Sequence, residues 1–250
     1  MSGHSKWATT KHKKAAVDAK RGKIFTKIIR EITIAAKAAG GDPDGNPRLR
    51  LAILKAKESN MPADNIKKAV QKGTGELPGV VYEEITYEGY GPGGVALLIL
   101  STTDNKNRTV SEIRHLLGKH GGNMAEAGSV AWMFERKGVL VIEKTGVKED
   151  DLMALVLDAG AEDLRSGDPA NFEVVCDAAT FEEVKKAVLD AGMAPTFSDL
   201  TYLPQSMIPL DGKTAEQMLG LMELLEDHDD VQEVYANFDI PDEVMAKIAG

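Results

Sequence analysis

Apolar residues recur at spacings of three and four over the first third of the chain, which is the pattern of helices that bury one face. Ile24, Ile28 and Ile32 begin the strongest of these stripes. Asn46 followed by Pro47 has the order of an N-cap and a first helical residue. The pattern predicts three short helices that form one bundle, over about residues 22–39, 46–59 and 62–75.

Beyond a hinge that contains Pro and Gly, at residues 77–79, apolar and polar residues alternate and β-branched residues become common. This period of two predicts strands over residues 81–88 and 95–102. The glycines from Gly89 to Gly94 have the spacing of a dinucleotide-binding fingerprint. That fingerprint requires a helix next, whereas a strand pattern follows here, so the sequence predicts a hairpin connection instead.

A polar run, TDNKNRT, extends from Thr103 to Thr109 and leads into an amphipathic helix. Thr109 and Glu112 have the spacing of a capping box, which predicts the start of that helix. Amides and cations at a helix N-terminus suit a phosphate, while capping alone selects similar residues, so both interpretations stay open. A strand over residues 129–134 is predicted after the helix.

From residue 137 onward, strand and helix patterns alternate, with helices expected over residues 148–159 and 181–191. The order strand-helix-strand-strand-helix-strand is the split βαβ, ferredoxin-like plan. The segment from Met207 supplies one more helix and a strand over residues 231–238, which cannot form a domain by themselves. We expect this segment to return and complete the domain that begins near residue 80.

The predicted fold class is therefore α+β, in a chain of 250 residues that is long enough for several cores. A basic three-helix domain is followed by two ferredoxin-like α/β domains, and the third domain is inserted in the second. The expected domains are residues 1–78 for nucleic-acid binding, residues 79–135 together with 205–250, and residues 136–204.

Charge is distributed unevenly along the chain. Residues 1–75 hold thirteen lysines and four arginines against six acidic side chains, a formal charge of +11, whereas residues 76–250 sum to −20. Clustered Lys and Arg neutralise phosphates and release counterions, so this cationic head predicts a nucleic acid as partner. The predicted contacts are Lys6, Lys11, Lys13, Lys14, Lys20, Arg21, Lys23, Lys27, Arg30, Arg48, Arg50, Lys55, Lys57, Lys67, Lys68 and Lys72.

The sequence contains no group of residues that is typical of an enzyme, a metal site or a cofactor site. His115 and His120 are five residues apart and so point in different directions on a helix, and Cys176 lies in an apolar strand pattern. The acidic residues between positions 226 and 230 favour a solvated turn over a metal site. We expect no catalysis, no metal, no cofactor and no small-molecule substrate.

The cellular compartment follows from cysteine usage and hydropathy. A single cysteine is typical of a reducing compartment. No apolar run reaches the roughly 20 residues that cross a bilayer, and the N-terminus lacks the apolar core of a signal peptide. We therefore expect a cytoplasmic protein with no membrane partner.

Several long motifs occur in order along the whole chain. They include GHSKW from Gly3, NPRLR from Asn46, YEGYGPGG from Tyr87, TDNKNRT from Thr103 and VYANF from Val234. In these motifs the chain resembles the YebC/PmpR family. The resemblance implies a cytoplasmic protein of three domains, described as a transcriptional regulator that binds DNA. It also implies kinship with mitochondrial translational activators of cytochrome oxidase, and with bacterial members that act at the ribosome on proline-rich nascent chains.

Two functions are compatible with these features. The first is a DNA-binding transcriptional regulator whose lysine-rich N-terminal domain holds the phosphate backbone. The alternative is a ribosome-associated translation factor that binds structured ribosomal RNA, and the predominance of Lys over Arg favours such recognition by shape and charge. Loop residues expected to contact a phosphate or the ribosome are Tyr90, Gly91, Asn105, Lys106, Asn107 and Arg108. The sequence makes no prediction of oligomeric state.

Overall fold

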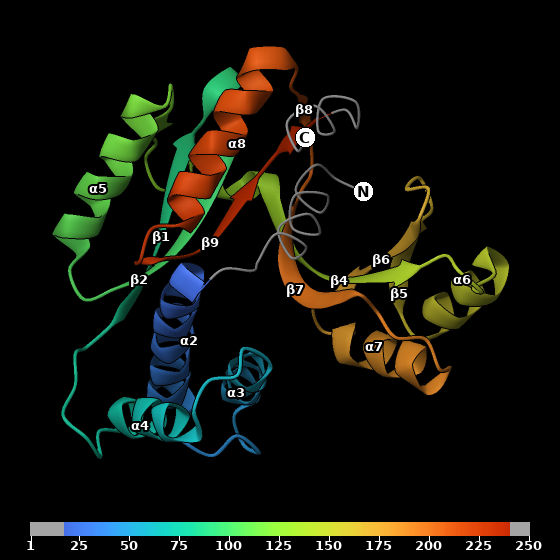
Figure 1. The fold of residues 1–250 in the computed structure, drawn as a ribbon. Coiled ribbons are helices and arrows are strands. Elements are labelled where there is room, and N and C mark those ends of the chain that lie inside the picture. Colours follow the sequence, from blue (N-terminus) through green and yellow to red (C-terminus); the bar gives the residue numbers. More distant parts are fainter. Residues whose placement is uncertain (1–17, 241–250) are drawn as a thin grey trace. The chain divides into compact units, whose positions relative to one another are not determined.

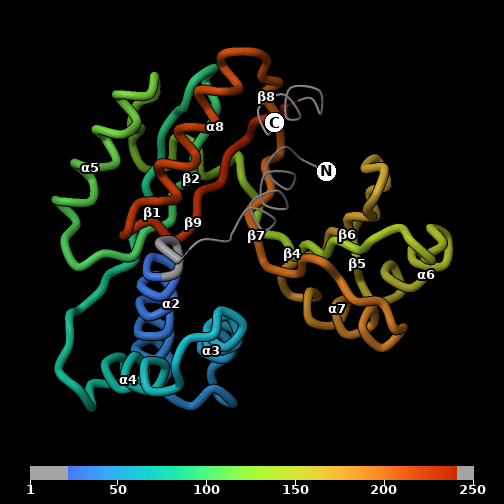
Figure 2. The backbone as a smooth tube through the Cα atoms, in the orientation of Figure 1, coloured from blue at the N-terminus to red at the C-terminus, as the bar shows by residue number. Residues whose placement is uncertain are grey.

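The computed structural model describes residues 18–240, which separate into two compact units (Figure 1, Figure 2). One unit holds residues 18–129 and 211–234, and the other holds residues 130–210 and 235–240. The α+β class is confirmed, because helices come first and two antiparallel four-stranded sheets follow. None of the helices in this part of the chain combines the length and the apolarity needed to cross a membrane.

The predicted bundle opens the first unit. Its helices are α2 (Asp18–Ala39), α3 (Pro47–Glu58) and α4 (Ala63–Thr74). Ile32 and Leu49 are fully buried in its core. Asn46 is the N-cap of α3, as predicted, and its side chain accepts a hydrogen bond from the Leu49 amide at 3.1 Å. Helix α4 can lie close to α2 because residue 73 is glycine, since a Cβ there would overlap the carbonyl oxygen of Thr33.

The first unit also contains a sheet in the order β3-β1-β2-β9. Its strands are β1 (Glu83–Tyr90), β2 (Ala96–Thr103), β3 (Asn123–Met124) and β9 (Val231–Ala236). The turn η1 (Pro92–Gly94) joins β1 to β2, so the predicted hairpin is confirmed. Helices α5 (Lys106–Lys119) and α8 (Gly212–Glu226) lie side by side against this sheet (Figure 1). Strand β9, the last long strand among residues 18–240, therefore pairs with β2, far earlier in the sequence.

The second unit has the ferredoxin-like connectivity and the sheet order β5-β6-β4-β7. Its elements are β4 (Phe134–Glu143), α6 (Glu149–Asp158), β5 (Ala161–Arg165), β6 (Asn171–Asp177), α7 (Phe181–Asp190) and β7 (Phe197–Pro204). Helices α6 and α7 pack on one face around Leu140, Val156 and Val184, which are fully buried. A short parallel pair, β8 (Ile208–Pro209) with β10 (Phe238–Asp239), belongs to the same unit.

The first sheet departs from the ferredoxin-like plan, because its hairpin places two strands before the first helix. The predicted strand over residues 129–134 is wrong, since η2 (Ala131–Met133) occupies half of it and β4 begins only at Phe134. β4 is continuous, so the expected domain boundary between residues 135 and 136 falls inside a strand. The division into domains stays a prediction.

The predicted capping box is also wrong. Asn105, rather than Thr109, caps α5, and its side chain accepts a hydrogen bond from the Arg108 amide at 3.1 Å. Thr109 lies one turn inside the helix and is fully buried. Both residues have capping chemistry, and the spacing to Glu112 selected the wrong one.

Candidate nucleic-acid interface

With the exception of Lys55, the cations predicted to contact nucleic acid fall into three groups. Four of them, Lys6, Lys11, Lys13 and Lys14, lie outside the described residues, and so do the side chains of Lys20 and Arg21. A second group bonds to other parts of the same unit. A third group is exposed on the bundle and forms no ion pair with a carboxylate among residues 18–240. Lys55 belongs to neither of the last two groups, because it is exposed but has an interaction of its own.

Three cations of α2, Lys23, Lys27 and Arg30, belong to the second group. The Lys23 Nζ donates to the Asp227 carbonyl oxygen at 3.1 Å and to its Oδ2 at 3.0 Å. The Lys27 Nζ donates to the Glu226 carbonyl oxygen at 2.5 Å. Both acceptors lie where α8 ends, and the last carbonyls of a helix lack intrahelical partners and carry partial negative charge. These two lysines therefore act as C-terminal caps of α8.

Arg30 lies one turn further along α2 and is buried, with 11% of its side chain exposed. Its Nη1 donates to Asp230 Oδ1 at 2.8 Å and to the Thr102 carbonyl oxygen at 3.3 Å, and it also bonds to the Asp229 carbonyl oxygen. The guanidinium stands over the Tyr82 ring at 5.5 Å from its centroid. A burial this complete leaves little of Arg30 for an external phosphate.

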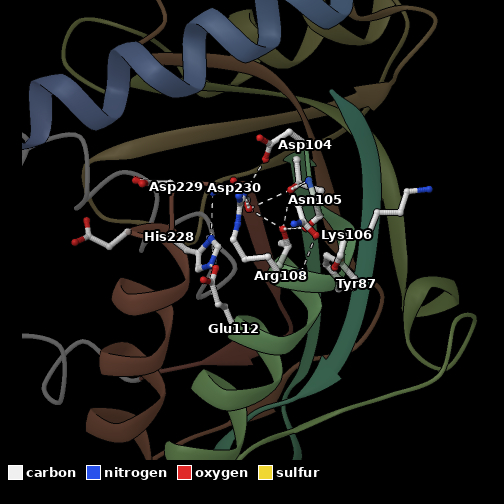
Figure 3. A network of polar contacts seen from close by, with 12 residues as sticks. Tyr87, Asp104, Asn105, Lys106, Arg108, Glu112, His228, Asp229 and Asp230 are labelled. Carbon is white, nitrogen blue, oxygen red and sulfur yellow. Dashed lines mark hydrogen bonds and ion pairs between the residues drawn. The ribbon is translucent and has the colours of Figure 1, made fainter. Parts of the chain in front are cut away.

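Asp230 is the centre of a polar network that Figure 3 shows from close by. Its side chain is 2% exposed, and its Oδ2 accepts from Thr109 Oγ1 at 2.6 Å, from Arg108 Nη2 at 2.7 Å and from Thr103 Oγ1 at 3.1 Å. Burial alone would raise the pKa of Asp230, but hydrogen bonds from Arg108 and Thr109 outweigh it and lower the pKa to about 2. The carboxylate is therefore charged at neutral pH.

This network places the loop residues that the sequence offered as phosphate contacts. Arg108 bonds to Asp230 and to Asp104, the latter at 2.8 Å. Lys106 pairs with Glu83 at 2.5 Å, and the Asn105 side chain caps α5. The carboxylate of Asp230 thus lies where the sequence suggested that a phosphate could bind, beside the first turn of α5 (Figure 3).

The remaining loop residues differ in their exposure. Asn107 is exposed, and Tyr90 is half-buried. Gly91 is buried, and a Cβ there would lie 2.7 Å from Met218 Sδ of α8. Helix α8 therefore packs directly onto the turn between β1 and β2.

Arg48 also bonds internally. Its guanidinium donates to Glu31 of α2, with Nε to Oε1 at 2.7 Å, and to Glu84 of β1, with Nη2 to Oε1 at 2.6 Å. Each carboxylate is engaged by two N–H groups. Hydrogen bonds to Glu84 and Glu31 raise the already high pKa of Arg48 further. Arg48 therefore connects α3, α2 and the first sheet.

The third group consists of exposed cations on α3 and α4, which we call the outer cations. They are Arg50, Lys57, Lys67, Lys68 and Lys72. Within residues 18–240 none of the five forms an ion pair with a carboxylate, although Arg50 donates to the Pro43 carbonyl oxygen at 3.3 Å. Their charges are thus balanced by solvent ions rather than by carboxylates of this part of the chain.

An open cleft of about 890 Å³ adjoins the network and is lined by residues of α2, of α5 and of the turn after α8, including Lys23, His115 and His228. Side-chain donor atoms of Glu112, His228 and Asp230 lie within 4.8 Å of one another. His228 Nδ1 accepts from the Asp230 amide at 3.1 Å, so its Nε2 carries the proton and bonds to Glu112 at 2.9 Å. Both imidazole nitrogens and the Asp230 carboxylate are therefore engaged, which disfavours a metal ion here.

Two family models match most of the chain. The one described as "TACO1/YebC protein N-terminal domain" matches residues 5–76, and the one described as "TACO1/YebC second and third domain" matches residues 82–238. The chain belongs to the TACO1/YebC family. The resemblance drawn from the sequence motifs is thereby confirmed.

Relatives within the TACO1/YebC family are similar over their full length. Proteins from Koribacter versatilis and Acidobacterium capsulatum are 60% and 58% identical, with all of both chains covered, and each is named a probable transcriptional regulatory protein. A crystal structure titled as a conserved hypothetical protein from Aquifex aeolicus is similar at a TM-score of 0.80 and 45% identity. That similarity covers 93% of this chain and 96% of the other. The names of the two relatives describe regulators rather than enzymes.

Sequence reasoning missed Asp230 in this TACO1/YebC chain, because it assigned residues 226–230 to a solvated turn. Asp229 is exposed as expected, but Asp230 is buried and bonded to Arg30, 200 residues away. An acidic run that follows an amphipathic helix in a chain with a basic head was the available signal. It does not say which carboxylate turns inward.

Proposed function

We propose that this protein is a DNA-binding transcriptional regulator that holds the phosphate backbone through the outer cations of α3 and α4. The observation that carries the proposal is that these five cations are exposed and form no ion pair with a described carboxylate. The names of its relatives support the regulatory role. The basic residues near the N-terminus, up to Arg21, are proposed as further contacts.

The domain assignment is part of this proposal. We propose that residues 1–78 act as the nucleic-acid-binding domain, with α/β domains at residues 79–135 plus 205–250 and at residues 136–204. Residues 76–250, with their formal charge of −20, would be repelled by the same phosphates. A bound polyanion should therefore contact the bundle and avoid the sheets.

A second candidate is a translation factor that binds structured ribosomal RNA. One observation favours it: three of the outer cations, Lys67, Lys68 and Lys72, are lysines of one helix, and lysine contacts phosphate as a point charge without reading a base. Recognition of an RNA shape suits such a surface. In that case the loop residues Tyr90 and Asn107 are the proposed secondary contacts, since Lys106 and Arg108 are occupied by carboxylates.

Footprinting on promoter DNA, compared with co-sedimentation with ribosomes, separates the two. The variant Lys67→Ala/Lys68→Ala/Lys72→Ala should lose binding, while Lys148→Ala/Lys186→Ala/Lys213→Ala, which removes three exposed lysines elsewhere, should keep it. Protection of promoter DNA by the wild-type chain, absent in the first variant alone, is the expected result. Sedimentation with ribosomes and no protection of DNA would replace the proposal by the second candidate.

A further inference from the structure

Three cations of α2 share one helix face. Lys23, Lys27 and Arg30 are separated by four and three residues, which brings their side chains to the same side of an α-helix. All three reach the same short segment, the turn over residues 226–230 between α8 and β9. We call this segment the acidic dock.

The acidic dock presents negative charge of two kinds. Asp227 Oδ2 and Asp230 Oδ1 are carboxylate oxygens, and they accept from Lys23 and Arg30 at 3.0 and 2.8 Å. Carbonyl oxygens of Glu226, Asp227 and Asp229 accept from the same three cations at the negative end of the α8 dipole. The dock therefore offers α2 the closely spaced oxygens that a phosphate backbone would offer.

Burial separates the rim of this contact from its centre. At the rim, the side chains of Lys23 and Asp227 are 44% and 58% exposed, and an ion pair of this kind is weak. At the centre, Arg30 and Asp230 are 11% and 2% exposed. Removing either partner of a buried pair leaves the other charge desolvated and unpaired. The central ion pair should therefore persist under conditions in which the ion pair at the rim breaks and re-forms.

We infer that these three cations of α2 bind the acidic dock and not a nucleic acid. We further infer that Arg30 is a positioning residue that fixes the bundle to the first sheet. The consequence for binding rests on the proposed function: Arg30 and Lys27 present the outer cations in a fixed orientation and do not themselves contact phosphate. The convergence of three cations of one helix face on one turn carries this inference. It assigns a structural role to residues that charge alone would assign to the ligand.

The test compares Arg30→Met with Lys67→Met in the full chain. We expect amide hydrogen exchange in α2 and in residues 226–230 to become roughly tenfold faster in Arg30→Met and to stay unchanged in Lys67→Met. The salt dependence of nucleic-acid binding should behave in the opposite way. Its slope should fall by about 0.9 in Lys67→Met on duplex DNA and stay unchanged in Arg30→Met.

Two further variants keep the test decisive. Lys27→Met removes the half-buried cation that bonds to the last carbonyl of α8, and it should speed exchange in α2 without changing the salt slope. Arg30→Lys should recover part of the protection that Arg30→Met removes, because all three acceptors converge on a single nitrogen and an ammonium group can donate three bonds. A reduced salt slope in Arg30→Met or Lys27→Met, with exchange as in the wild type, would overturn the inference. If the wild-type chain bound neither DNA nor ribosomes, the proposed function would fail. The hydrogen-exchange results would still show whether the acidic dock holds α2.

Discussion

Helices α2 and α4 have similar sequences in one respect: each carries several cations at helical spacing. Their cations differ in what surrounds them. Lys23, Lys27 and Arg30 of α2 meet the acidic turn after α8, whereas Lys67, Lys68 and Lys72 of α4 meet no described carboxylate. A basic stretch therefore indicates an external polyanion only through the cations that remain once those with acidic partners in the same fold have been set aside.

The largest effect is expected from removing the carboxylate that α2 depends on. Asp230→Ala would leave Arg30 buried without its counter-charge and Arg108 without one of its two partners. The expected loss is about 3–5 kcal/mol in the free energy of unfolding, measured by denaturant titration followed by circular dichroism. The neighbouring Asp229→Ala, whose side chain is exposed, is the control and should cost no more than about 0.5 kcal/mol. Equal losses of stability in the two variants would contradict the claim that the buried ion pair of Asp230 with Arg30 stabilises the fold.

Acid should weaken the same contact. The pKa of Asp230 in the folded chain is about 2, below its ordinary value of 3.8, so its carboxylate stabilises the fold above pH 4 and this contribution is lost as the pH falls from 4 to 2. The loss corresponds to about 2 kcal/mol. Unfolding curves of the wild type and of Asp230→Asn, recorded across this range, should converge toward the acid end. A difference in the free energy of unfolding between the two proteins that stayed constant down to pH 2 would contradict the lowered pKa of Asp230.

A smaller effect is expected at Arg48, which connects the bundle to β1 from an exposed position. Arg48→Lys cannot engage Glu31 and Glu84 with two N–H groups each, and it should lower the free energy of unfolding by up to about 1 kcal/mol. Arg50→Lys on the same helix, which has no carboxylate partner among residues 18–240, should change it very little. Denaturant titration of both variants measures these losses. A larger loss of stability in Arg50→Lys than in Arg48→Lys would contradict the prediction.

Local signals in the sequence predicted much of the fold. The N-cap Asn46, the hairpin at Gly89 to Gly94 and the alternation of strands and helices in the ferredoxin-like unit each depend on a few adjacent residues, and each is confirmed. The strand expected over residues 129–134 failed because a β-rich composition does not exclude a 3-10 turn before a long strand.

The internal partners of the basic residues were harder to predict, for a physical reason. Arg30 and Asp230 are 200 positions apart, and the hydrophobic periodicity of neither segment indicates that the two residues are in contact. The same holds for Arg48 with Glu84, which lie on a helix and on a strand. Charge counting identified a basic segment of the chain but gave all its cations equal weight, because only tertiary contact reveals which of them already have a partner.

The role of the outer cations is tested most directly by the salt dependence of nucleic-acid binding in the variant Lys67→Ala/Lys68→Ala/Lys72→Ala. We expect a slope lower than that of the wild type by about 2.7 on duplex DNA, because each of the three lysines neutralises one phosphate, and we expect stability to be unchanged. The variant Lys148→Ala/Lys186→Ala/Lys213→Ala, with the same change of net charge, should keep the wild-type slope. A slope in the α4 variant equal to that of the wild type would contradict the assignment of these exposed lysines to the interface.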